Sequence, residues 1–254
     1  MATLSVVMIV RDESANLRAC LDGLRWADEI VIVDSGSSDD TVAIAREFTE
    51  KVYVERDWQG YGIQRCRAQA RASGDWILMI DADERVTPEL RREIQRVVAE
   101  DRRDRVYALP RLSFCFGRFI RHGGWYPDYV IRLYPRERAE YDDAPVHEKV
   151  RYGPGMSVVR LRGDLLHYTY RDLQHYLTKS AAYAAAWASA RAAAGRRASL
   201  SQGILHGIAC FVRMYLLRGG FLDGRAGLLL ALLSAHSTFV KYADLWIRTA
   251  ARRA

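Results

Sequence analysis

Residues 74–84, GDWILMIDADE, decide the fold, because an apolar strand there runs directly into a cluster of acidic residues. Residues 76–80 form a continuous apolar run, which is typical of a strand covered on both faces of a sheet. Asp81 and Asp83 follow at once, and residues 87–89 (TPE) are a favourable start for a helix. The stretch therefore predicts a strand, an acidic loop and a helix in succession.

Similar strand–helix units precede this segment. Residues 4–10, 29–33 and 51–54 are apolar, β-branched runs, and each is followed by a stretch with helical spacing. Repeated units of this kind predict a parallel sheet, in which ligands bind at the carboxyl ends of the strands. Two polar loops, residues 34–39 and 81–84, fall at those ends, so the sequence places the candidate site there.

The pattern changes twice further along the chain. After residue 106, short strands such as residues 129–134 lie between Gly, Pro and aromatic residues, which predicts antiparallel strands and loops. From residue 171 onwards the spacing is helical. We therefore predict an α/β domain over residues 1–170 and a helical extension over residues 171–254.

Composition excludes several classes of protein. The 254 residues are 50% hydrophobic and 27% charged, which excludes a disordered chain and a polytopic membrane protein. The four cysteines have no metal-ligand spacing, and no basic leader precedes the first strand. These features predict a reduced, cytoplasmic protein.

The net charge of +7 is unevenly placed, with 26 basic and 28 acidic residues up to Tyr170 but 12 basic and 3 acidic after it. Within the basic part, residues 198–212 and 226–240 carry no charged side chain. Each stretch is shorter than the roughly 20 residues of a spanning helix. Apolar stretches flanked by cations predict helices that lie in an anionic membrane interface. A helical subdomain packed on the catalytic part, or a homodimer interface, is the alternative.

The acidic loops suggest nucleotide chemistry. Side chains two apart on an extended segment point the same way, so Asp81 and Asp83 could share a divalent cation with diphosphate oxygens. Asp34, in a Gly- and Ser-rich loop, could accept from a nucleobase or ribose, although the loop is no GxGxxG fingerprint. A solvated acidic turn and a helix N-cap loop are the structural alternatives.

Several motifs in order resemble those of the family 2 glycosyltransferases, which have the GT-A fold. The motifs are VVMIVRDE, EIVIVDSGSSDDT, GDWILMIDADE, GGWYPD, VHE and LLHY, spread over roughly residues 3–180. The later segments GGWYPDYVIRLY, APVHEKV and LLHYTYRDLQHYL are similar to bacterial lipopolysaccharide core glycosyltransferases of the WaaE/KdtX type. This resemblance implies a UDP-sugar donor, a divalent cation (Mg²⁺ or Mn²⁺), a lipid-linked oligosaccharide acceptor and a location on the inner face of the cytoplasmic membrane.

The resemblance also implies roles for individual residues. Asp12, Ser35 and Cys66 depart from the residues common in relatives, which puts nucleotide selectivity in question. The implied roles are nucleotide-sugar binding for Arg11, Glu13, Asp34, Arg65 and Asp81, metal binding for Asp83 and His167, and acceptor binding for Gly124, Trp125 and His147.

Inverting glycosyl transfer needs a base for the acceptor hydroxyl and a cation for the departing nucleoside diphosphate. Glu148, in VHE, falls where the family's catalytic carboxylate is expected, and Asp128, in WYPD, is the rival. The structural alternative for Glu148 is an ion pair with Lys149 or a nearby arginine. The expected reaction is therefore transfer of a sugar, glucose from UDP-glucose by the resemblance, to the lipopolysaccharide inner core.

Three other functions compete with this one. Another envelope polysaccharide could be the acceptor. A sugar nucleotidyltransferase would carry a Gly-rich loop after the first strand, and VRDESANL has no glycine. A non-catalytic membrane or nucleic-acid binder does not need the acidic pair or VHE, and the near-neutral charge before residue 170 disfavours a nucleic-acid groove.

Overall fold

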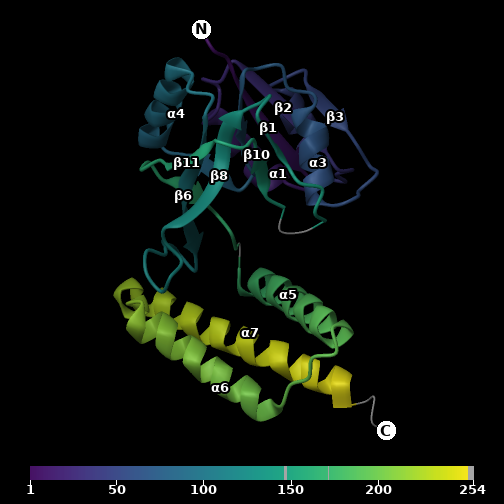
Figure 1. The fold of residues 1–254 in the computed structure, drawn as a ribbon, viewed down its shortest axis with the longest axis vertical. Coiled ribbons are helices and arrows are strands. Elements are labelled where there is room, and N and C mark those ends of the chain that lie inside the picture. Colours follow the sequence, from purple (N-terminus) through teal and green to yellow (C-terminus); the bar gives the residue numbers. More distant parts are fainter. Residues whose placement is uncertain (146–147, 171, 251–254) are drawn as a thin grey trace. The chain divides into compact units, whose positions relative to one another are not determined.

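The computed structural model describes residues 1–145, 148–170 and 172–250 (Figure 1). Its contacts divide the chain into two compact units, each assembled from two segments. The first unit combines Met1–Arg111 with Asp128–His167, and the second combines Leu112–Pro127 with Tyr168–Ala254.

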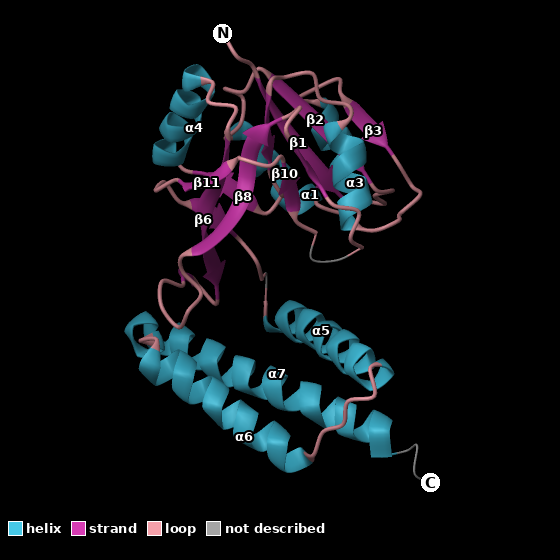
Figure 2. Ribbon diagram, viewed as in Figure 1, coloured by secondary structure: helices cyan, strands magenta, loops and turns pink. Residues whose placement is uncertain are grey.

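A mixed sheet forms the centre of the first unit (Figure 2). Its strands lie in the order β3-β2-β1-β4-β8-β6-β12-β5. The first four are parallel, β8 pairs antiparallel with β4, and β6 pairs antiparallel with β8. The bounds are Leu4–Val10 for β1, Glu29–Asp34 for β2, Val52–Val54 for β3, Trp76–Met79 for β4, Glu84–Val86 for β5, Arg105–Cys115 for β6, Asp128–Pro135 for β8 and Leu165–His167 for β12.

The parallel strands thus form where the sequence predicts them. The antiparallel strands differ from expectation, since β6 and β8 extend the central sheet instead of forming a separate cover. Ser157–Arg160 (β11) pairs in parallel with β6, and Ala139–Tyr141 (β9) and Val150–Tyr152 (β10) form a small second sheet.

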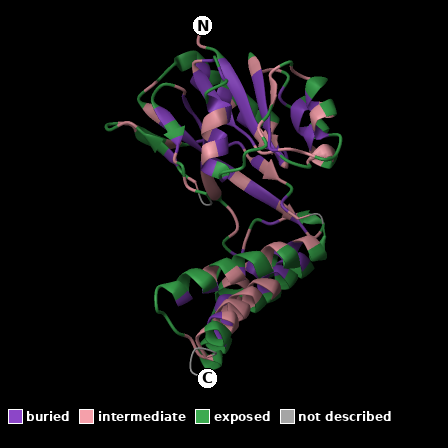
Figure 3. Cartoon of the chain, turned by 90° about the vertical axis from the view of Figure 1, so that its right-hand side faces the viewer, coloured by how far each residue is buried: buried purple, intermediate pink, exposed green. Residues whose placement is uncertain are grey.

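Alternate residues of the central strands enter two separate cores. Val6 and Met8 of β1 pack with the helices Ser14–Asp22 (α1), Thr41–Arg46 (α2) and Pro88–Glu100 (α4). Val7 packs with the helix Tyr61–Gln69 (α3) and with β9 and β10. The strands therefore read as continuous apolar runs because both faces of the sheet are covered, as their burial shows (Figure 3).

The second unit is mainly helical. Its helices are Leu173–Ala193 (α5), Leu200–Phe211 (α6), a π-helical continuation at Val212–Leu217, a 3₁₀ turn at Gly220–Asp223 and Gly224–Ala250 (α7), with Arg118–Phe119 (β7) paired to the end of β6. Helix α7 packs against both α5 and α6. The predicted fold class, α/β with a C-terminal helical extension, is confirmed.

The C-terminal helices are longer than their uncharged stretches indicate. Leu200–Leu217 and Gly220–Ala250 are long and apolar enough to cross a membrane, judged by length and composition alone. The uncharged stretches alone are too short to span a membrane, but the helices that contain them are long enough.

Candidate active site

Asp34, the last residue of β2, fixes the loop that follows this strand. Asp34 is 1% exposed, and its Oδ1 accepts hydrogen bonds from the backbone N–H of Gly36 (2.8 Å) and Ser37 (2.9 Å). Its Oδ2 accepts from the Ser37 hydroxyl. Asp34 therefore shapes the loop at the carboxyl end of β2; its predicted contact with uridine stays a prediction.

The loop after β1 is tied to the loop after β2. Asp12 adopts a left-handed backbone (φ 52°), and its Oδ1 accepts from the backbone N–H (2.7 Å) and hydroxyl (3.0 Å) of Ser38. The Glu13 N–H donates to Thr41 Oγ1 at 2.8 Å, and Arg11 lies exposed beside Asp12. The structure therefore brings the Arg11–Glu13 segment to the Asp34 loop, in agreement with the shared nucleotide-sugar role that the resemblance implies for Arg11, Glu13 and Asp34.

Residues 81–84 form a turn and not an extended segment. The Glu84 N–H donates to the Asp81 carbonyl at 2.9 Å, and the Asp81 N–H donates to Glu84 Oε2 at 2.9 Å. Because the backbone turns here, the side chains of Asp81 and Asp83 have different partners. The parallel orientation predicted for the two carboxylates was wrong.

Asp81 lies between two buried arginines. Arg65 donates through Nη2 to Asp81 Oδ1 (2.8 Å) and through Nε to Glu148 Oε1 (2.9 Å). Arg132 donates to Asp81 Oδ2 and, at 2.8 Å, to Glu84 Oε1. Residues from α3, the turn after β4, the start of β5, β8 and the segment before β10 are therefore joined in one continuous set of ion pairs.

Asp128 is linked to these ion pairs through Arg111. Its Oδ2 accepts from Arg111 Nη2 at 2.7 Å, and Arg111 Nη1 lies 3.8 Å from Glu84 Oε1. The Asp128 side chain is 45% exposed, whereas that of Glu148 is 14% exposed. The two candidate bases thus differ in their surroundings, and each is paired with an arginine.

Burial sets the electrostatics of the network. Burial raises the pKa of the Glu84 carboxyl, which is fully enclosed. Burial acts the same way on Asp81, but Arg132 and Arg65 outweigh it and hold the pKa of Asp81 well below its usual range. Among the residues that the structure describes, Arg65 Nη1 and Arg132 Nε are buried donors without a hydrogen-bond partner. Each guanidinium group can therefore donate one more hydrogen bond.

Asp83 and His167 form the candidate metal pair. Strand β12 pairs with β5 so that His167 lies opposite Glu84, and this register brings His167 Nε2 to 3.3 Å from Asp83 Oδ2. A carboxylate oxygen and an imidazole nitrogen fit a divalent cation whose other ligands are diphosphate oxygens and water. Within residues 1–145, 148–170 and 172–250, no group of three or more His, Cys, Asp or Glu is placed to hold a metal.

Two of the predicted acceptor residues, Gly124 and Trp125, lie in the second compact unit. Gly124 has φ 82°, a left-handed backbone that accounts for the glycine, and a Cβ there would lie 2.3 Å from Nη1 of the flexible Arg218 side chain. The ring of Trp125 packs near that of Tyr170, with centroids 6.5 Å apart. His147 lies outside the described residues. Their acceptor role stays a prediction.

Sequence reasoning missed Arg132, Glu84 and Arg111. A detectable signal was present for Arg132, because it is the one cation inside the apolar run VIRLY of residues 130–134. A charged residue in a covered strand needs a buried partner, and the turn at residues 81–84 supplies two.

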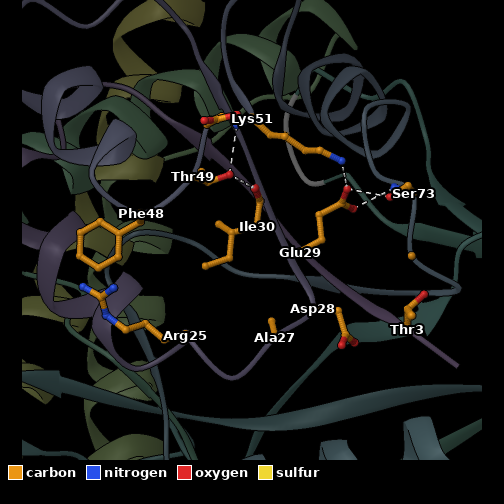
Figure 4. A pocket seen from close by; sticks show the side chains of 12 residues that line it. Thr3, Arg25, Ala27, Asp28, Glu29, Ile30, Phe48, Thr49, Lys51 and Ser73 are labelled. Carbon is orange, nitrogen blue, oxygen red and sulfur yellow. Dashed lines mark hydrogen bonds and ion pairs between the residues drawn. The ribbon is translucent and has the colours of Figure 1, made fainter. Parts of the chain in front are cut away.

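The pocket in Figure 4 lies at the amino ends of β1, β2, β3 and β4, opposite the ends that carry the acidic loops. On its wall, Glu29 accepts from Ser73 N–H (2.8 Å) and Ser73 Oγ (2.7 Å), and it also pairs with Lys51 and Ser5. These contacts tie the amino ends of the strands together, away from the acidic loops.

A sequence model of the family described as glycosyl transferase family 2 matches residues 5–161, more than half of the chain. The chain belongs to glycosyltransferase family 2. The predicted family and enzyme class are confirmed, and the central α/β unit is the part of the glycosyltransferase that this match covers.

Two sequence relatives and one solved structure are similar to this chain. An uncharacterized glycosyltransferase of Rickettsia felis is 27% identical over 96% of this chain and 90% of its own. The lipopolysaccharide core biosynthesis glycosyltransferase LpsC of Rhizobium meliloti is 28% identical over 97% of this chain and 93% of its own. The crystal structure of S. aureus TarS 1–349 with UDP-GlcNAc is 14% identical, covers 99% of this chain and 92% of that chain, and has a TM-score of 0.49.

Replacing Arg132 by methionine should destabilise the glycosyltransferase by about 3–5 kcal/mol, because Asp81 and Glu84 then lose a buried counter-ion. Urea unfolding at pH 7 measures this loss. Arg105→Met, which removes a partly exposed cation 4.0 Å from Asp104, is the matched control and should cost less than about 1 kcal/mol. Equal stability of Arg132→Met and the wild type would contradict the assignment.

Glu29 should give the glycosyltransferase part of its resistance to acid. Burial opposes ionisation, but hydrogen bonds from Lys51, Ser5 and Ser73 outweigh it and lower the pKa of Glu29 to about 2, against 4.5 for the ordinary group. A lowered pKa adds stability above pH 4.5, and this is lost as the pH falls towards 2. Glu29→Gln should therefore lose about 2–3 kcal/mol at pH 7 and show a shallower loss of stability between pH 4.5 and 2.

Thermal unfolding across this pH range tests the Glu29 prediction. Glu50→Gln, in which an exposed carboxylate beside the same pocket is removed, should follow the wild-type profile. A Glu29→Gln profile parallel to that of the wild type would show that Glu29 does not carry the effect.

Proposed function

We propose that this glycosyltransferase moves a hexose, glucose from UDP-glucose, with inversion onto the inner core of lipopolysaccharide or a similar lipid-linked envelope glycan. One observation carries the proposal: Arg65 holds Glu148 and Asp81 at 2.9 and 2.8 Å. These three residues are far apart in the sequence, and the resemblance assigns them to the base and the donor. The similarity to LpsC of Rhizobium meliloti, a lipopolysaccharide core biosynthesis glycosyltransferase, supports the acceptor class.

In the proposed mechanism, Glu148 Oε accepts the proton of the acceptor hydroxyl as that oxygen attacks the anomeric carbon. Arg65 Nε donates to Glu148 Oε1 and so fixes the position of this carboxyl group, and the buried Nη1 of Arg65 leaves one donor for a phosphate oxygen. Asp83 and His167 would hold a divalent cation, which stabilises the charge on the departing nucleoside diphosphate. Arg132 and Glu84 keep the turn at residues 81–84 in place.

Residues 1–170 are proposed as the catalytic domain and residues 171–254 as the part that associates with the cytoplasmic membrane. The excess of cations after Tyr170 supports this division, because the inner leaflet carries anionic lipids. A lipid-linked acceptor lies in the same membrane, so association would bring the enzyme to its substrate.

Donor and metal binding can be tested by thermal shift with UDP, GDP and ADP, each with and without Mn²⁺ or Mg²⁺. UDP with metal should raise the Tm of the wild type, and Asp83→Ala should abolish the metal-dependent part. Asp104→Ala, in which an exposed carboxylate is removed, should behave as the wild type. A shift with GDP or ADP alone would contradict the UDP-glucose assignment, and no shift at all would favour a non-catalytic membrane module.

The identity of the base can be tested with Glu148→Gln and Asp128→Asn. Glu148→Gln should lower kcat by about 10²–10⁴-fold, because the amide cannot take the proton. Asp128→Asn should lower kcat only a few-fold, because in the proposed mechanism Asp128 binds Arg111 and does not take the proton. Transfer from radiolabelled UDP-glucose to detergent-solubilised acceptor lipid measures both. The reverse order of effects would make Asp128 the base.

A further inference from the structure

Helix α6 presents small residues to its partner α7. Gly203, Gly207 and Cys210 are its buried residues. A Cβ on Gly203 would lie 3.2 Å from the Phe239 ring and from Tyr242 Cβ, both on α7. One on Gly207 would lie 3.2 Å from the Ala235 carbonyl oxygen. The two helices therefore approach closely, with little room between them for larger side chains.

The large apolar side chains of α6 point the other way. Ile204, Leu205 and Ile208 are 52%, 67% and 58% exposed, and Figure 3 colours many residues of the helical unit as exposed. We call these residues, with those that continue them through the turn and the start of α7, the outer apolar face. Its other members are Leu216, Leu217, Phe221, Leu222, Leu228, Leu229 and Leu232.

This arrangement is the reverse of a water-soluble helix pair, in which large apolar residues pack inward and polar residues face out. Only 22% of the apolar window in Leu200–Leu217 is buried, so α6 is not the core helix of a soluble domain. Small residues between helices and large apolar residues outside are typical of pairs surrounded by lipid, where apolar side chains gain nothing from facing inward.

The charges around the face favour an anionic bilayer over a second copy of the chain. Cations flank the face at Arg213, Arg218 and Arg225. The nearby Asp223 is 1% exposed and accepts from His122 N–H at 2.8 Å and from Arg121 N–H at 3.1 Å. Two copies joined through this face would bring like charges together, whereas anionic headgroups would neutralise them.

We propose that the outer apolar face of α6, the turn and α7 inserts among the acyl chains of an anionic bilayer, so that the helix pair is embedded and not held by charge alone. This proposal rests on the membrane association proposed above and specifies its contact surface. The cations at the ends of the helices then lie at the level of the phosphate groups.

The test uses flotation of the full chain with vesicles of phosphatidylcholine containing one quarter phosphatidylglycerol. The wild type should stay bound in 1 M NaCl, because burial of apolar surface is not screened by salt. The triple substitution Ile204→Ser, Leu205→Ser and Ile208→Ser should lower the partition constant on the order of 100-fold. Val158→Ser with Tyr152→Ser, which alters exposed apolar residues of the first unit, should bind as the wild type.

Other outcomes would overturn the proposal. Release of the wild type by salt would show that charge alone holds it, and unchanged binding of the triple variant would remove the face from the contact. A triple variant that binds normally but changes from dimer to monomer by light scattering would assign the face to a second copy.

Two further measurements keep these outcomes interpretable. Leu217→Ser, at a site 78% exposed, should weaken binding without risk to the helix packing. Activity toward UDP-glucose is measured separately in detergent, so a loss of the proposed function is distinguishable from a failure to insert.

Discussion

The buried pair of guanidinium groups around Asp81 is the constraint on which the catalytic unit depends. Asp81 and Glu84 lie in one tight turn, and without Arg132 their carboxylates would stand enclosed with too little compensation. Arg132 reaches them only because β8 adds to the sheet directly beside β4. The antiparallel insertion of β8 is therefore as necessary to the acidic turn as the parallel strands are.

The pairing of β12 with β5, at the end of the sheet that β5 closes, also brings distant residues together. The pairing of β12 with β5 brings His167, 84 residues further along the chain, beside Asp83. Glu148 reaches Arg65 on α3 across 83 residues. These residues are contributed by separate segments, so the site exists only once the sheet has formed, and the turn at residues 81–84 is its fixed centre.

The sequence predicted the regular part of this structure well, because strands covered on both faces leave a clear apolar signal. Residues 76–79 and the helix that starts after Thr87 form as expected, with Thr87 Oγ1 accepting from the Leu90 N–H. The site was predicted less completely. A carboxylate's partner depends on side-chain direction, so the turn at Asp81 and the inward arginine of β8 could not be read from local spacing.

The second unit is assembled from residues 112–127 and from the helices after residue 167. Cys115 and Ile120 of the early segment are buried with Tyr176 and Leu230, which the ribosome makes much later. During synthesis the apolar side chains of residues 112–127 stay uncovered until α7 has emerged from the ribosome. Helix α7 therefore determines when this unit can close, and the period before α7 emerges is when the uncovered segment has most need of a chaperone.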